Sequence, residues 1–152
     1  MVAEGEQAPD FALSDETGST IRLTDLRGSK VVLFFYPKDD TPGCTIEACE
    51  FRDAYSRLRT AGARIFGISP QDGASHRQFK EKFGLPFPLL VDEDHRVADA
   101  YGVWKQRQVQ GEIRWGNERT TFIIGEDGRI TRIFPRVTPT GHSREILAAL
   151  RE

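Results

Sequence analysis

The pattern of apolar positions predicts strands that alternate with helices. Residues 31–36 (VVLFFY) form a continuous β-branched and aromatic run, which is typical of a strand buried on both faces. Residues 63–69 have the composition of a second strand. Near the start, residues 11–14 and 20–23 flank a turn signal at residues 15–18 and predict an N-terminal β-hairpin.

A helix is predicted from about residue 42 to residue 60, directly after the first buried strand. Thr41 is a good N-cap, and Pro42 then falls at the first helical position, where its missing N–H does no harm. Gly62 ends the helix. Its apolar face consists of residues at helical spacing: Phe51, Ala54, Tyr55 and Leu58.

The middle of the chain continues the alternation of helix and strand. A helix carries Phe79 and Phe83 on one face and is closed by Gly84. Residues 88–91 suggest a short strand. After it, Asp92 is expected to cap a helix that runs through Tyr101 and stops at the following glycine.

The last third of the chain predicts a hairpin followed by a helix. Residues 119–124 and 129–134 form two strands joined by Glu126-Asp127-Gly128, a strong hairpin signal. The final helix, about residues 142–151, buries Ile146, Leu147 and Leu150. We therefore expect one α/β domain over residues 1–152, with a mixed central sheet flanked by helices.

Composition narrows the class of protein. The chain has 152 residues, 38% of them hydrophobic and 29% charged, which is enough to build a core. A net charge of −2 and a pI near 6.0 argue against a nucleic-acid binder or a polybasic membrane surface. The acidic residues 1–6 lack the features of a signal peptide, and no long apolar run suggests a membrane span. We expect a cytoplasmic protein, although an organellar protein with its transit peptide trimmed would look the same.

The two cysteines lie close together in residues 36–49 (YPKDDTPGCTIEAC). In a reducing cytosol such a pair is more often metal-binding, catalytic or inert than a structural disulfide. Cys44 falls in the first turn of the predicted helix, where unpaired backbone N–H groups and the positive helix end stabilise a thiolate. Gly43 leaves room beside the sulfur for a small substrate. The alternative is a small buried cysteine at a helix start.

The helical period places Cys44 and Glu47 on the same buried face as Phe51, whereas Cys49 lies about 140° away, toward the polar side. A carboxylate on an inward face is costly unless it meets a cation or hydrogen-bond donors. Glu47 is therefore a candidate acceptor that orients an arginine beside the thiolate. The alternative is a fraying first-turn glutamate that interacts only with the helix dipole.

These residues carry a resemblance to a known family. The segment around Cys44 resembles the active site of the peroxiredoxins and is most similar to the peroxiredoxin Q, or bacterioferritin comigratory protein, subfamily. The resemblance implies a thioredoxin fold with an N-terminal β-hairpin extension, and it extends over essentially the whole chain. The matching segments are residues 5–11, 35–39, 41–45, 47–49, 51–53, 119–128 and 141–147.

The resemblance assigns a role to five residues. Cys44 matches the peroxidatic cysteine and Cys49 the resolving cysteine. Pro37 matches the proline that shields the sulfur, and Thr41 the threonine whose hydroxyl contacts the peroxide. Arg119 matches the arginine that holds thiolate and substrate together, a role suited to a side chain that cannot lose its charge.

The implied reaction is a thiol peroxidase cycle. The Cys44 thiolate attacks a hydroperoxide and becomes a sulfenic acid, and Cys49 condenses with it to give an internal disulfide. The resemblance implies that thioredoxin or a similar dithiol protein reduces that disulfide. No metal, flavin or haem cofactor is required. We expect a monomer, because a disulfide within one chain removes the need for a dimer.

Three other classes remain as alternatives. A redox sensor or stress-inducible binding protein would use the same disulfide as a switch. A thioredoxin-like disulfide reductase usually needs Cys-x-x-Cys, whereas here four residues separate the cysteines. A metal-binding module is weaker still, because the histidines lack ligand spacing and each is interpreted as a lone surface residue: His76, His95 and His142. Three large aromatic residues are interpreted as packing residues: Tyr55, Trp104 and Trp115.

Overall fold

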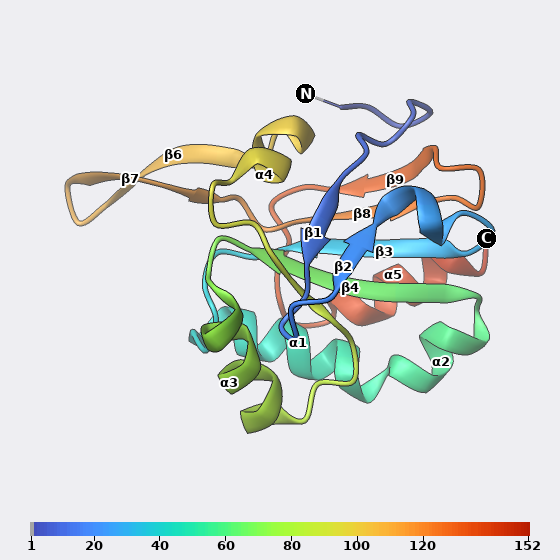
Figure 1. Ribbon diagram of the computed structural model, residues 1–152, viewed down its shortest axis with the longest axis horizontal. Helices are drawn as coiled ribbons and strands as arrows, with labels where there is room; N and C mark the ends of the chain where they lie inside the picture. Colours follow the sequence, from blue (N-terminus) through green and yellow to red (C-terminus); the bar gives the residue numbers. More distant parts are fainter. Residues whose placement is uncertain (1) are drawn as a thin grey trace.

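A five-stranded mixed sheet forms the centre of the computed structural model, which describes residues 2–152 (Figure 1). The strand order is β5-β4-β3-β8-β9. Strands β3, β4 and β5 run parallel, whereas β8 is antiparallel to β3 and β9 to β8. This confirms the expected mixed central sheet. The five strands are Lys30–Phe35 (β3), Ala63–Ser69 (β4), Leu89–Val91 (β5), Thr120–Ile124 (β8) and Ile130–Phe134 (β9).

Both faces of the sheet are covered, because side chains alternate between them along β3. Val32 and Phe34 face one buried cluster, and Leu33 and Phe35 face the other. The first cluster is closed by helices α1 (Pro42–Asp53), α2 (Tyr55–Thr60), α3 (Gly73–Phe83) and α5 (His142–Leu150) (Figure 1). The second is closed by strands β1 (Ala12–Ser14) and β2 (Thr20–Arg22), the 3-10 turn η1 (Leu23–Leu26) and helix α4 (Arg96–Tyr101). Within residues 2–152, no helix has the length and apolar character needed to cross a bilayer.

Two predicted helices differ from the structure. The helix predicted over residues 42–60 is interrupted at Ala54, whose ψ of 1° leaves the helical range. This break lets α1 pack against α5 while α2 packs against β4. Helix α4 begins at Arg96 rather than at Asp92. Asp92 still acts as a cap from outside the helix, because its carboxylate accepts the backbone N–H groups of Val97 and Ala98.

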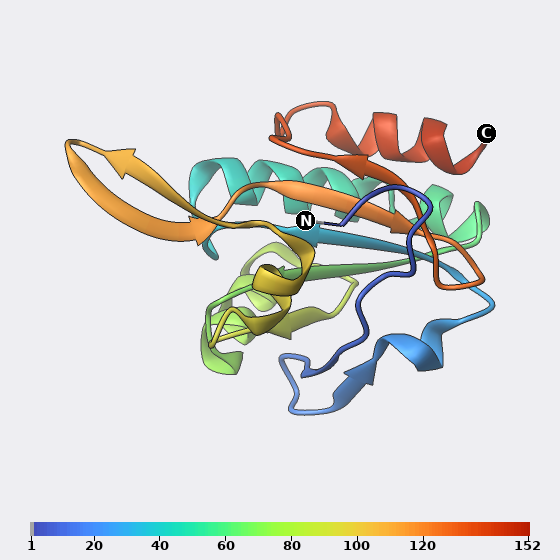
Figure 2. The ribbon, with the colours of Figure 1, turned by 90° about the horizontal axis from the view of Figure 1, so that it is seen from above.

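The hydrophobic pattern did not predict one hairpin. Strands β6 (Trp104–Val109) and β7 (Glu112–Asn117) pair with each other and project away from the central sheet (Figure 2). The interpretation of Trp115 as a packing residue is wrong, since 59% of its surface is exposed on this arm. Most positions of the arm contact solvent on both faces, so the arm lacks the buried alternation from which strands are predicted.

Candidate active site

The first turn of α1 holds Cys44 beneath the end of the central strand β3. The chain leaves β3 at Phe35, passes through a short loop, and enters α1 with Pro42 at its first position. Cys44 is 2% exposed and packs in the same cluster as Tyr36 and Phe51. The sulfur is thus shielded from solvent and lies close to the unpaired N–H groups of a helix start.

Arg119 reaches Cys44 because of the register of the sheet. Phe35 pairs with Thr120, so the residue before β8 lies at the same edge as the start of α1. Its Nη2 donates to Cys44 Sγ at 3.3 Å, and its Nη1 donates to Glu47 Oε1 at 2.9 Å. Burial alone lowers the pKa of Arg119, but the charges of Glu47 and Cys44 raise it above its ordinary value. The guanidinium therefore stays charged beside the sulfur.

Glu47 is buried on the inward face of α1, as the helical period predicts, with 1% of its surface exposed. Burial raises its pKa to about 7, and the neighbouring Arg119 partly opposes that rise. Its second oxygen, Oε2, has no hydrogen-bond partner among residues 2–152. The hypothesis that Glu47 orients an arginine fits this geometry, and a solvated first-turn glutamate does not fit its burial.

Gly43 makes room for Arg119 rather than for a substrate. A Cβ atom at this position would lie 3.1 Å from Arg119 Nη2 and 3.5 Å from Pro139 Cγ. The space that the sequence suggested for a small substrate is thus occupied by the guanidinium. A side chain at Gly43 would push the cation away from the sulfur of Cys44.

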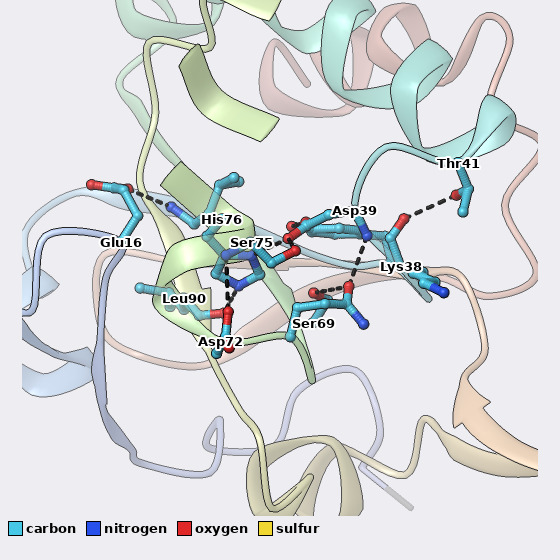
Figure 3. A network of polar contacts seen from close by, with 12 residues as sticks. Glu16, Lys38, Asp39, Thr41, Ser69, Asp72, Ser75, His76 and Leu90 are labelled. Atoms are coloured by element: carbon cyan, nitrogen blue, oxygen red, sulfur yellow. Dashed lines mark hydrogen bonds and ion pairs between the residues drawn. The ribbon is translucent and has the colours of Figure 1, made fainter. Parts of the chain in front are cut away.

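Thr41 and Pro37 lie in the loop between β3 and α1. Thr41 is at the N-cap position, but its side chain makes no hydrogen bond to the helix. Its hydroxyl instead donates to the carbonyl oxygen of Lys38 at 2.9 Å (Figure 3). The predicted N-cap position is confirmed, but the capping side-chain hydrogen bond is absent, and the Thr41 lone pairs are left to accept a hydrogen bond. Pro37 is half-buried at the beginning of the same loop.

Cys49 is half-buried on the same helix α1, and both cysteines are free thiols. Burial raises the pKa of the Cys49 thiol, and the nearby Arg52 opposes this effect only in part. Cys49 therefore remains protonated over a wider pH range than an ordinary cysteine. Its position, away from Arg119, agrees with the placement toward the polar side of the helix.

Two of the three histidines were wrongly interpreted as surface residues. His76 is 0% exposed, and its Nδ1 lies 2.6 Å from Asp39 Oδ2. His142 is 1% exposed and contacts the Thr121 hydroxyl; burial lowers its pKa. The partners Asp39 and Thr121 come from distant parts of the chain, so a sequence window does not reveal them, whereas Glu145 contacts His142 from three residues away on the same helix. Within residues 2–152, no three His, Cys, Asp or Glu side chains gather in a group that could hold a metal ion.

Sequence comparisons identify relatives over nearly the whole chain. The profile of the AhpC/TSA family matches residues 4–133. Peroxiredoxin Bcp of Bacillus subtilis is 44% identical over 148 residues, which cover 97% of this chain and 94% of that protein. Peroxiredoxin Bcp of Escherichia coli is 40% identical over 148 residues, which cover 97% of this chain and 95% of that protein.

Solved structures agree with these relatives. A cysteine-to-serine mutant of PrxQ from Xylella fastidiosa matches with a TM-score of 0.93 and 32% identity, covering 99% of this chain and 96% of that chain. The Xanthomonas campestris bacterioferritin comigratory protein, studied for alkyl peroxide reduction, matches with a TM-score of 0.88 and 35% identity, covering 93% and 90%. The expected thioredoxin fold is thereby confirmed. The chain belongs to the AhpC/TSA family and, within it, to the peroxiredoxins of the Bcp and PrxQ type.

Proposed function

We propose that this peroxiredoxin reduces hydrogen peroxide and organic hydroperoxides with Cys44 as the nucleophile. The observation that carries the proposal is the single guanidinium of Arg119, which contacts the Cys44 sulfur at 3.3 Å and the Glu47 carboxylate at 2.9 Å. The similarity to a Xanthomonas campestris protein studied for alkyl peroxide reduction supports the choice of substrate class. A fixed cation beside a buried sulfur favours both the thiolate and the negative charge that develops on peroxide oxygen.

In the first step, the Cys44 thiolate attacks the distal oxygen of a hydroperoxide ROOH. An S–O bond forms, the O–O bond breaks, and RO⁻ leaves and takes a proton to become an alcohol or water. The Thr41 hydroxyl, whose hydrogen is donated to Lys38, accepts the hydrogen bond of the hydroperoxide O–H. Arg119 stabilises the charge along the breaking bond, and Pro37 shields the sulfur from bulk water.

In the second step, the Cys49 thiol condenses with the Cys44 sulfenic acid, forming a disulfide and releasing water. Both residues lie in the regular helix α1, where a separation of five positions puts their Cα atoms roughly 8–9 Å apart. A disulfide needs about 4.4–6.8 Å between Cα atoms. The helix from Pro42 to about Ala48 must therefore unwind before the disulfide can form.

The surroundings of α1 suit a local unwinding of this kind. The break at Ala54 separates α1 from α2, so α1 is a short unit of 12 residues. Beyond Cys49, the Glu50 carboxylate accepts the backbone N–H of Gly141 at 2.9 Å, which ties the second half of α1 to the start of α5. Unwinding is thus confined to the half that carries Cys44. The exposed disulfide is then reduced by thioredoxin or a similar dithiol protein, and the cycle needs a single chain.

A steady-state assay of peroxide-dependent thioredoxin oxidation tests this function. We expect sustained turnover with hydrogen peroxide and with an organic hydroperoxide, and one disulfide joining Cys44 to Cys49 by mass spectrometry. Formation of that disulfide with no sustained turnover would favour a redox sensor. An absence of any peroxide consumption by the reduced protein would overturn the proposal.

A further inference from the structure

A buried polar cluster anchors the loop between β3 and α1, which carries Thr41 (Figure 3). At its centre is Asp39, which is 8% exposed. Its Oδ1 accepts the Tyr36 hydroxyl at 2.5 Å, and its Oδ2 accepts the Ser75 hydroxyl at 2.8 Å and lies 2.6 Å from His76 Nδ1. Its backbone N–H donates to Gln71 Oε1 at 2.7 Å. One residue of the loop is thus held by the end of β3, the loop after β4 and helix α3.

The proton distribution in the cluster follows from its acceptors. His76 Nε2 lies 2.8 Å from the carbonyl oxygen of Leu90, which can only accept, so Nε2 carries a hydrogen. A second proton lies between Nδ1 and the Asp39 carboxylate. Burial, with the Asp39 charge, raises the pKa of Tyr36 well above its ordinary value, so its hydroxyl remains a donor. Two hydroxyl groups and one imidazole nitrogen are thus directed at the same carboxylate, which fixes its position.

The backbone after Asp39 shows what this pair restrains. Asp40 has a φ of 57°, in the left-handed region that non-glycine residues seldom adopt. Its side chain contacts Lys82 only at the surface, where both side chains are largely exposed. The next residue is Thr41, whose hydroxyl turns back to the Lys38 carbonyl. The strained backbone at Asp40 therefore connects the buried Asp39–His76 pair to the Thr41 hydroxyl, which we assign to peroxide binding. This strained conformation persists because Asp39 is fixed.

We propose that the Asp39–His76 pair positions the active-site loop, so that Thr41 and the start of α1 hold the geometry that captures peroxide at Cys44. Both residues act through the loop and touch no substrate. The proposal rests on the peroxidase function proposed above. The Asp39–His76 pair also limits the local unwinding of α1 on its N-terminal side. Asp39 lies before Pro42 and stays in place while the first half of α1 unwinds.

The test compares two reactions of the same sulfur in Asp39→Asn, which keeps the shape of the side chain and removes its charge. We expect the loop to shift in this variant and the second-order rate constant for the reaction of Cys44 with hydrogen peroxide to fall by about tenfold or more. The reason is that small misplacements of the groups that position the peroxide have large effects on the rate. Alkylation of Cys44 by iodoacetamide needs no bound peroxide, so we expect it to change by less than about threefold. Hydrogen–deuterium exchange in residues 38–43 should accelerate, with the sheet unchanged.

The matched control is His95→Gln. His95 also pairs with an aspartate, its Nδ1 lying 2.7 Å from Asp99 Oδ2, but both side chains are exposed. We expect this variant to retain the wild-type rates with both reagents. Rescue is tested with Asp39→Glu, which restores the charge and should recover part of the peroxide rate that Asp39→Asn loses.

Two outcomes would overturn the proposal. One is a folded Asp39→Asn protein with wild-type peroxide kinetics, and the other is an equal loss of both rates, which indicates a purely structural role.

If Asp39→Asn does not fold, Tyr36→Phe provides the test, since it removes one hydrogen-bond donor to the Asp39 carboxylate and keeps the ring in the core. A slower peroxide reaction with unchanged alkylation supports the proposal, and unchanged kinetics with lower stability refutes it. An inactive wild-type protein would instead refute the proposed function, while exchange in residues 38–43 would still report on the loop.

Discussion

The two cysteines share one helix but have opposite environments. Cys44 is 2% exposed, faces the core, and receives a charge-assisted hydrogen bond from Arg119. Cys49, five residues later, is half-buried on another side of the helix, and burial raises the pKa of its thiol. Its neighbouring cation, Arg52, binds Asp53 at 3.0 Å, so that charge is already partly neutralised.

This difference separates the two chemical tasks that we propose. A peroxide nucleophile must be a thiolate in a site that excludes water and stabilises charge on oxygen. A resolving thiol must remain available without competing for peroxide, and a protonated Cys49 meets that condition. The amino-acid type is the same at both positions, so the surroundings of the sulfur decide its role. Each prediction below alters one side of this comparison.

The largest effect is expected for Cys44→Ser. Serine is not ionised near neutral pH and is a far poorer nucleophile, so peroxide consumption should fall to the background rate. The measurement is hydrogen peroxide consumption by the reduced protein, with and without a thioredoxin system. Sustained turnover by Cys44→Ser would move the peroxide chemistry to another residue.

The matched change at the second cysteine, Cys49→Ser, should leave the first step intact. We expect rapid consumption of about one peroxide per chain, followed by a stall as the Cys44 sulfenic acid accumulates. Trapping with a sulfenic-acid reagent and mass spectrometry identifies the product. Full steady-state activity with thioredoxin in Cys49→Ser would remove Cys49 from the mechanism.

The third prediction uses a second pair of variants to compare the cations beside the two cysteines. Arg119→Ala should slow peroxide attack by about 10²-fold, the typical loss when one pre-oriented donor to developing charge is removed. Arg52→Ala is the control, because Arg52 lies beside Cys49 and should leave the first step unchanged. Stopped-flow measurement of peroxide-dependent oxidation gives both rates. A similar loss in the two variants would indicate a general effect of positive charge, with no specific role for Arg119.

The sequence predicted the parts of this comparison that depend on local periodicity. Three local features are enough to place Cys44 and Glu47 on the buried face of α1. They are the buried run of residues that ends at Tyr36, the proline at the first helical position, and the spacing of Phe51 and Leu58. These features depend on short-range sterics and on the period of the helix. The break at Ala54 was not predictable in this way, because it reflects packing of α1 on α5 and of α2 on β4.

The contacts that complete the site come from distant segments. Arg119 lies 75 positions from Cys44, and without the family resemblance it would be interpreted as an exposed arginine at a strand end. His76 meets Asp39 across 37 positions. Its spacing from Phe79 and Phe83 places it on the apolar face of α3, but that spacing does not identify its partner. The space at Gly43 was assigned to substrate because the guanidinium that fills it comes from the distant residue before β8. Pairing of polar groups across elements is a tertiary property, which a single sequence seldom reveals.

A fourth prediction concerns the helix itself. When Cys44 and Cys49 form a disulfide, amide exchange across residues 42–50 should accelerate relative to the reduced protein, while strands β3 and β8 keep their protection. The physical reason is the separation of about 8–9 Å in the intact helix, which the bond cannot span. Hydrogen–deuterium exchange with mass spectrometry measures both states. Equal protection in the two states, with the disulfide confirmed, would contradict local unwinding.

The smallest effect is expected from the charge of Glu47. Its pKa of about 7 lies above the ordinary carboxyl value because of burial, so the folded protein binds this proton more tightly than the unfolded chain does. Stability should therefore fall as pH rises from the ordinary carboxyl range through about 7. Over the same interval the carboxylate forms and strengthens its hold on Arg119, so the peroxide rate should rise.

Glu47→Gln removes this titration and replaces the charge-assisted hydrogen bond to Arg119 by a neutral one, a difference of about 1 kcal/mol or about fivefold in rate above neutral pH. The control is Glu50→Gln, on the same helix, whose carboxylate binds the Gly141 N–H and whose charge helps to raise the pKa of Glu47. In that variant the step in the peroxide rate should move to lower pH. Stopped-flow rates from about pH 6 to about pH 8 resolve both effects. A step near neutrality that persists unchanged in Glu47→Gln would assign it to another group.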